Sequence, residues 1–152
     1  MTTRVTVSTS LDAPPDAVWA AIKRPATIVR ITPGPALIDT RSLPEELHEG
    51  QTMNLRLRPV PALPAWRHHI AIRRVDDDGR VLQTQEHGGV VRQWDHTITV
   101  EPRGSGSRYT DSVIIDAGVF TPAVRTFAQG LYRARQRNLR RLGASLGQTA
   151  QG

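Results

Sequence analysis

The sequence predicts an α+β fold in which a curved antiparallel β-sheet wraps around a long C-terminal α-helix, with two short helices after the first strand. Segments of alternating apolar and polar residues, separated by turn residues, fill most of residues 36–117. Residues 121–142 instead repeat their apolar side chains at helical spacing. The length of 152 residues fits one domain with its own core.

The N-terminal segment predicts one strand and two short helices. Residues 4–11 alternate with period two, which is typical of a half-buried strand. The prolines that follow fit a first helical turn, where a missing amide costs little, so we expect a helix over residues 17–22. A second short helix is expected over residues 26–31, before the Pro33-Gly34-Pro35 stop.

The middle of the chain predicts an antiparallel meander with tight turns at residues 76–79 and 102–106. A strand register that shifts by one residue turns every side chain to the other face, and the first of these turns leaves the register open. The sequence therefore does not decide whether Gln85, Glu86 or His87 faces inward. The six expected strands cover residues 36–39, 52–58, 66–75, 80–87, 91–100 and 108–117.

The C-terminal segment predicts an amphipathic helix from residue 121 or 122 to about Leu142. Gly143 is a typical C-cap residue, so we expect the helix to end there. One domain over residues 1–145, with a frayed tail over 146–152, follows from this ending. The apolar stripe expected to face the sheet comprises Phe120, Val124, Phe127, Leu131 and Leu142.

The net charge of +6 belongs entirely to residues 125–152, which hold six arginines and no acid. On a helical wheel Arg133, Arg137, Arg140 and Arg141 lie opposite the apolar stripe. Solvated arginines on an exposed face are the simplest interpretation. Transient contact with an anionic membrane surface through Arg133, Arg137 and Arg140 is the alternative. We expect no nucleic-acid partner, because no aromatic side chains alternate with basic ones on the sheet.

Several classes of protein do not fit the composition. The absence of cysteine excludes disulfide frameworks and thiolate chemistry. The N-terminus has no apolar signal region and no apolar run approaches a membrane span, so we expect a cytoplasmic protein. We expect no metal site, since His68 and His69 are adjacent on a strand and face opposite ways. No cofactor motif is present, and the oligomeric state is left open.

Polar side chains are predicted on the apolar face of the last hairpin. Trp94, His96, Ile98 and Val100 share a face of their strand. A turn centred near residues 104–105 places Tyr109, Asp111, Val113 and Ile115 on the same face. His96 is then either a proton donor, acceptor or anchor for a ligand oxygen, or a core histidine bonded to its neighbours. Asp111 in the second case closes a turn or pairs with an arginine.

Arg135 departs from the other helix arginines. The wheel places it with Asn138 on the apolar side, beside Leu131 and Leu142. An inward guanidinium needs an acceptor, since an unpaired buried charge is very costly. Three outcomes are open: an ion pair with Asp111, Asp95 or Glu86, a side chain that reaches past the stripe to water, or an anchor for an acidic ligand.

Two segments carry a family resemblance. Asp12-Ala-Pro-Pro-Asp-Ala-Val-Trp19 resembles the first strand-to-helix junction of the START-like, polyketide cyclase/dehydrase (SRPBCC-type) superfamily of helix-grip proteins. Residues 92–100 (Arg-Gln-Trp-Asp-His-Thr-Ile-Thr-Val), a Gly/Ser turn and residues 108–113 (Arg-Tyr-Thr-Asp-Ser-Val) resemble its last hairpin. The resemblance covers residues 3–142 and specifies the fold better than the ligand.

The resemblance implies a hydrophobic cavity between the sheet and the long helix. We expect it to bind or carry a hydrophobic small molecule such as a lipid, a polyketide or an aromatic metabolite. The alternative is a cyclase, aromatase or dehydratase in which His96, with Asp111 or Arg135, acts on a carbonyl substrate. The expected ligand-binding side chains are Trp94, His96, Asp111, Val113, Phe127, Leu131, Arg135 and Asn138.

Overall fold

Along the chain, one strand is followed by two short helices, five strands and one long helix. The computed structural model describes residues 1–33, 41–58 and 61–150, with the side chains of residues 149 and 150 excepted. The elements are β1 (Thr3–Leu11), α1 (Pro15–Ile22), α2 (Pro25–Ile31), β2 (Thr52–Leu57), β3 (Trp66–Asp76), β4 (Val81–Gly88), β5 (Val91–Arg103), β6 (Gly106–Asp116), the 3-10 turn η2 (Gly118–Phe120) and α3 (Thr121–Ala150).

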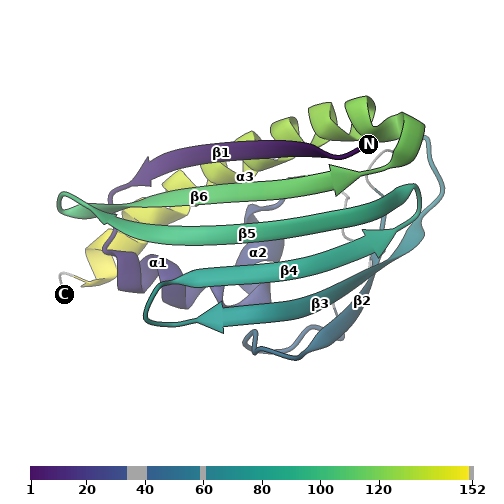
Figure 1. Ribbon diagram of the computed structural model, residues 1–152. Helices are drawn as coiled ribbons and strands as arrows, with labels where there is room; N and C mark the ends of the chain where they lie inside the picture. Colours follow the sequence, from purple (N-terminus) through teal and green to yellow (C-terminus); the bar gives the residue numbers. More distant parts are fainter. Residues whose placement is uncertain (34–40, 59–60, 151–152) are drawn as a thin grey trace.

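The described strands form one antiparallel sheet in the order β1-β6-β5-β4-β3-β2. α3 packs against β1 and β6, and α1 and α2 lie on the same side of the sheet (Figure 1). This arrangement confirms the helix-grip fold, with the curved sheet around the C-terminal helix. The expected strand over residues 36–39 lies outside the described residues.

Two registers decide which side chains face the helix. Arg103 pairs with Gly106, so a two-residue turn joins β5 to β6 as predicted, and Gly104 adopts the positive φ of 55° that such a turn favours. Ile70 pairs with Glu86, and His69 pairs with His87. Because alternate residues face opposite sides, Glu86 shares the inner face with its buried neighbour Thr84. Gln85 and His87 therefore point outward.

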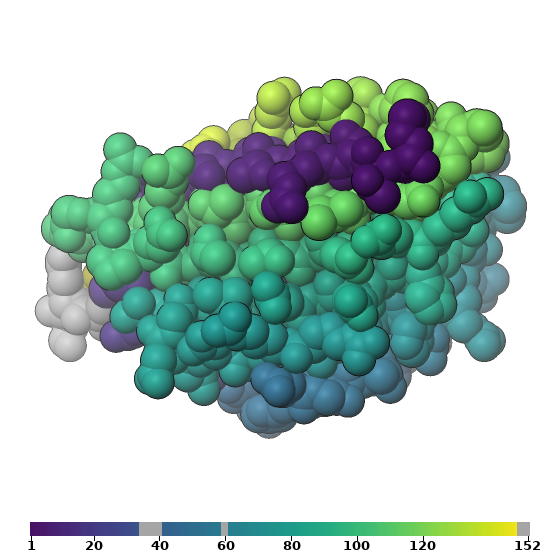
Figure 2. Space-filling view, viewed as in Figure 1, coloured from purple at the N-terminus to yellow at the C-terminus, as the bar shows by residue number. Residues whose placement is uncertain are grey.

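The sheet has one buried and one solvated face. The solvated face carries short polar side chains over β1 and β6, and Thr6–Ser112 and Ser8–Thr110 hydroxyl pairs cross the strands there. Figure 2 shows this side, with β1 along one edge and the helix visible only behind it. Period-two alternation in the sequence thus matches a sheet covered on one side by helices.

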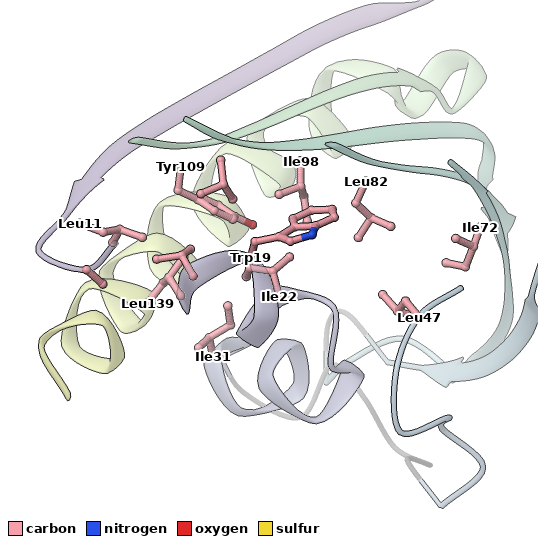
Figure 3. Close-up of a cluster of buried hydrophobic side chains, with 13 residues drawn as sticks. Leu11, Trp19, Ile22, Ile31, Leu47, Ile72, Leu82, Ile98, Tyr109 and Leu139 are labelled. Carbon is pink, nitrogen blue, oxygen red and sulfur yellow. The ribbon is translucent and has the colours of Figure 1, made fainter. Parts of the chain in front are cut away.

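The buried face forms two hydrophobic clusters. The larger one joins α1, α2, the sheet and the second half of α3; Trp19, Ile98, Tyr109 and Leu139 belong to it (Figure 3). The smaller one lies at the other end of the sheet, against the first half of α3. Its buried members are Val5, Val91, Trp94, Val113, Ile115, Ala128 and Tyr132.

The prediction that the long helix ends at Leu142, with Gly143 as its C-cap, is wrong. α3 has 30 residues and runs to Ala150. A Cβ on Gly143 would lie 3.7 Å from Cδ2 of Leu11, an ordinary contact, whereas a Cβ on Gly147 would clash with the carbonyl oxygen of Asp12. Gly147 is therefore a helical residue that lets α3 approach the β1–α1 junction closely.

The predicted apolar stripe is displaced around the helix. Phe120 lies in η2 before the helix and is 55% exposed, and Phe127 and Leu131 are only half-buried. The prediction weighted the largest apolar residues, but tyrosine, glutamine and arginine also occupy the contact face. The residues of α3 that are fully buried are Thr121, Ala128, Tyr132, Arg135, Gln136, Leu139, Gly143 and Gly147.

Candidate ligand site between the sheet and the long helix

A layer of polar side chains separates the two hydrophobic clusters. His96 lies between Trp94 and Ile98 on β5, and these two belong to different clusters. Asp111 lies in the same way between Tyr109 and Val113 on β6. On α3 the polar pair Arg135 and Gln136 stands between Tyr132 of the smaller cluster and Leu139 of the larger one.

Asp111 is the centre of the first hydrogen-bond network. It is completely buried, and its Oδ1 lies 2.8 Å from Nε2 of His96 and accepts a 3.0 Å hydrogen bond from the Tyr109 hydroxyl. Its Oδ2 accepts a 3.0 Å hydrogen bond from Nε2 of Gln136. The same Gln136 nitrogen donates to the carbonyl oxygen of Val7 at 2.7 Å. The network therefore ties α3 to β1, β5 and β6.

Glu86 is the centre of the second network. Its Oε2 lies 2.9 Å from Nε2 of His68. Its Oε1 accepts a 2.6 Å hydrogen bond from the hydroxyl of Thr84. These three side chains come from β3 and β4, so the network carries the polar layer across the sheet away from α3.

The networks keep both carboxylates ionised. Burial opposes the charge of Asp111, but hydrogen bonds from His96 and Gln136 and the charge of Arg135 outweigh burial and lower its pKa. Burial likewise opposes the charge of Glu86, and the hydrogen bonds from His68 and Thr84 prevail, so its pKa is also lowered. Burial and the charge of Asp111 raise the pKa of Tyr109 well above its ordinary value, so the hydroxyl remains a donor.

Arg135 points inward, as predicted, but has no acceptor among the described residues. Its exposed fraction is 8%, so most of the side chain is withdrawn from water. Within the described part of the chain no ion pair with Asp111, Asp95 or Glu86 forms, and Nε is buried without a hydrogen-bond partner. The contact that the structure records is with Tyr132, whose ring centroid lies 5.6 Å from the guanidinium carbon.

Arg135 is nevertheless held in its charged form. Burial opposes the charge, but the nearby carboxylates of Asp111 and Glu86 favour it, and the pKa of the guanidinium is raised. The Tyr132 ring in turn stacks on His96, with centroids 4.9 Å apart and an interplanar angle of 26°. A charged guanidinium is therefore fixed against an aromatic ring beside two carboxylates that it does not contact.

The other expected site residues do not all join this layer. Trp94 and Val113 are buried in the smaller cluster, and Phe127 and Leu131 are half-buried on α3. Asn138 donates a 2.9 Å hydrogen bond to the carbonyl oxygen of Ile31 and so fastens α2 to α3. Their role toward a ligand stays a prediction.

Sequence reasoning missed Gln136 and Thr84 in the layer, and Tyr132 beside it. Gln136 was not singled out, although helical spacing places it one turn from Tyr132, which was also missed. Thr84 was missed as well, because the register of β3 and β4 was open. Once the structure places Glu86 on the inner face, alternation places Thr84 there as well.

His69 and His87 lie on the solvated face of the sheet. His69 and His87 stack with their ring centroids 5.0 Å apart, and His69 contacts Asn54 at 3.2 Å. With Arg67 these side chains line a shallow surface hollow. In the part of the chain that the structure describes, no three metal-binding side chains come together.

The comparisons with known proteins agree with this architecture. A profile of the family described as "Polyketide cyclase / dehydrase and lipid transport" matches residues 2–145. The chain belongs to this family. Its match covers both segments on which the START-like resemblance rests, and it confirms that resemblance. A comparison with curated proteins gave no match.

Solved structures share the fold of this cyclase/dehydrase family member. Norcoclaurine synthase from Thalictrum flavum, in complex with dopamine and hydroxybenzaldehyde, has a TM-score of 0.73 at 20% identity over 95% of this chain and 88% of that one. TTHA0849 from Thermus thermophilus has a TM-score of 0.66 at 18% identity, over 94% and 98% of the two chains. Ara h 8.0201 has a TM-score of 0.61 at 14% identity, over 91% and 99%. Identities this low support a common fold and leave the ligand open.

None of these likenesses bears on membrane contact or assembly. Among the helices that the structure describes, none combines the length and apolar composition needed to cross a bilayer. The arginines at positions 133, 137, 140 and 141 are exposed, as predicted. Arg140 donates a 2.9 Å hydrogen bond to Thr9 on the edge strand. Contact of this face with a membrane surface stays a prediction.

Proposed function

We propose that this family member binds and carries a mostly apolar small molecule between the sheet and α3. The observation that carries the proposal is the side chain of Arg135, whose Nε is buried and has no acceptor among the described residues. A buried donor without a partner costs roughly 1–3 kcal/mol, and more when it is charged. A protein that retains such a group gains by binding a molecule that supplies the acceptor.

The surroundings of Arg135 fit a ligand with a polar end and an apolar body. Apolar side chains lie on both sides of the polar layer, in the clusters that contain Tyr132 and Leu139. Most binding sites for small molecules share this design, with a few placed polar groups among apolar walls. The family description, which includes lipid transport, supports the same interpretation.

The test is native mass spectrometry of freshly purified protein, followed by extraction and identification of the molecules that copurify. We expect a bound apolar molecule of a few hundred daltons that is released by organic solvent. Protein that copurifies with nothing, and that binds neither apolar dyes nor a panel of lipids and aromatic compounds, would contradict the proposal.

The alternative function is a cyclase or dehydratase that acts on a carbonyl substrate. The contact of His96 with Asp111 at 2.8 Å favours it, because a carboxylate that orients an imidazole is common in proton transfer. Norcoclaurine synthase, whose fold this chain shares, was solved with an aldehyde and an amine bound. Exchange of the α-protons of ethyl acetoacetate for deuterium, followed by NMR, tests it. Wild-type protein should speed the exchange and His96→Gln should not; equal rates would exclude this chemistry.

A further inference from the structure

We propose that the ligand of this site is an organic anion, and that its oxyanion binds directly to the guanidinium of Arg135. This inference rests on the proposed function and names the chemical class of the ligand. An acid with an apolar body, such as a fatty acid or an aromatic acid, meets the requirement.

Among the described residues, no acceptor is left over for Arg135. The Asp111 carboxylate has three donors, since His96 and Tyr109 reach Oδ1 and Gln136 reaches Oδ2. The Glu86 carboxylate has two donors, one for each oxygen. All four oxygens of the nearest carboxylates are therefore engaged by side chains other than Arg135.

Arg135 is held in position by its neighbours. Its side chain leaves α3 one turn before Leu139, which is completely buried, and its guanidinium lies over the ring of Tyr132. That ring is itself fixed by stacking on His96. A donor fork that is already oriented loses little conformational entropy when it binds a planar carboxylate through two hydrogen bonds.

The charges around the guanidinium of Arg135 are compatible with an anionic ligand. The carboxylates that favour the cation are Asp111 and Glu86, and His68, His96 and Tyr109 donate to these carboxylates. Electrostatic energy falls with distance, so an oxyanion in contact with Arg135 gains more from the guanidinium than it loses to carboxylates beyond contact distance. A neutral ligand would leave Nε without a charged partner.

A pair of dyes with nearly the same apolar body tests the inference at pH 7. 8-Anilinonaphthalene-1-sulfonate carries an anion, and N-phenyl-1-naphthylamine lacks it; both change fluorescence on entering an apolar site. Arg135→Gln should weaken binding of the sulfonate about tenfold to a hundredfold and binding of the neutral dye less than twofold. Arg133→Gln, an exposed arginine on the same helix, is the matched control and should change neither.

The outcomes separate the inference from the function on which it rests. Equal loss of both dyes in folded Arg135→Gln protein overturns the anion anchor while binding of an apolar molecule stands. Failure of the wild-type protein to bind either dye overturns both. If Arg135→Gln does not fold, dodecanoate and 1-dodecanol are compared as competitors for the neutral dye in the wild-type protein. The inference requires dodecanoate to displace it at a concentration at least tenfold lower, and equal potency contradicts it.

Discussion

Gln136 donates from Nε2 to Oδ2 of Asp111 at 3.0 Å, although its neighbour on the helix, Arg135, is the residue whose charge would suit that carboxylate. A neutral amide thus occupies the carboxylate oxygen and the cation stays unpaired among the described residues. Gln136 also donates to the carbonyl oxygen of Val7, so one side chain satisfies two buried acceptors. This arrangement makes the availability of Arg135 depend on Gln136.

Replacing Gln136 should therefore affect both stability and ligand binding. Gln136→Leu leaves the Val7 carbonyl and one oxygen of Asp111 without their donor, which should lower the free energy of unfolding by about 1–3 kcal/mol. It also frees Asp111 to pair with Arg135, so affinity for the anionic dye should fall although Arg135 is unchanged. Urea unfolding and dye titration measure the two effects. Gln129→Leu, at a half-buried position of the same helix, should leave dye binding intact.

The lowered pKa values of Asp111 and Glu86 predict acid sensitivity. A carboxyl whose pKa is lower in the folded state contributes stability above its unfolded pKa, and loses that contribution as the pH falls through the folded value. Stability should thus decline below about pH 4. Urea unfolding of wild-type and Asp111→Asn protein between pH 7 and pH 3 measures this decline. The variant should be less stable by about 2–4 kcal/mol at pH 7, with a gap that narrows in acid. If the difference in free energy of unfolding between the two proteins were constant with pH, the charge of Asp111 would not contribute to stability.

Alanine substitutions at three glycines of α3 should have different effects on stability, and those at Gly143 and Gly147 test where the helix ends. Gly130 is exposed and a Cβ there meets nothing within 4 Å, so Gly130→Ala should raise the free energy of unfolding by about 0.5–1 kcal/mol. Gly143→Ala should be neutral or stabilising, because Gly143 is helical and its Cβ would make an ordinary contact. Gly147→Ala should destabilise, since its Cβ would strike the backbone of Asp12. Marked loss of stability in Gly143→Ala would instead support a helix that stops there in a left-handed cap.

The sequence was sufficient for the fold, for physical reasons that particular residues show. Alternation over residues 91–100 and 108–117 fixed the inner face of the last hairpin, because the two-residue turn allows one register. The same alternation in β3 and β4 could not fix their register, because a bulge between Ile72 and Arg74 shifts the pairing and no local pattern indicates it. The inward position of Glu86 therefore came from the structure.

The site was predictable only in part. The wheel placed Arg135 inward correctly, since four other arginines marked the opposite face. It could not show whether Arg135 or Gln136 would donate to the carboxylate of Asp111, because that depends on the distance between helix and sheet. At the far end of the helix, the lack of a side chain on Gly147 lets α3 come close to Asp12.

The guanidinium of Arg135 is charged, and its buried Nε–H, which has no acceptor among the described residues, is available to an oxyanion. The most direct measurement follows its Nε–Hε resonance by ¹H–¹⁵N NMR, assigned by its loss in Arg135→Lys protein. We predict that dodecanoate shifts this resonance strongly and slows its hydrogen exchange, whereas 1-dodecanol at the same occupancy leaves it nearly unchanged. A resonance that responds equally to both compounds, or to neither while dodecanoate is shown to be bound, would contradict the claim.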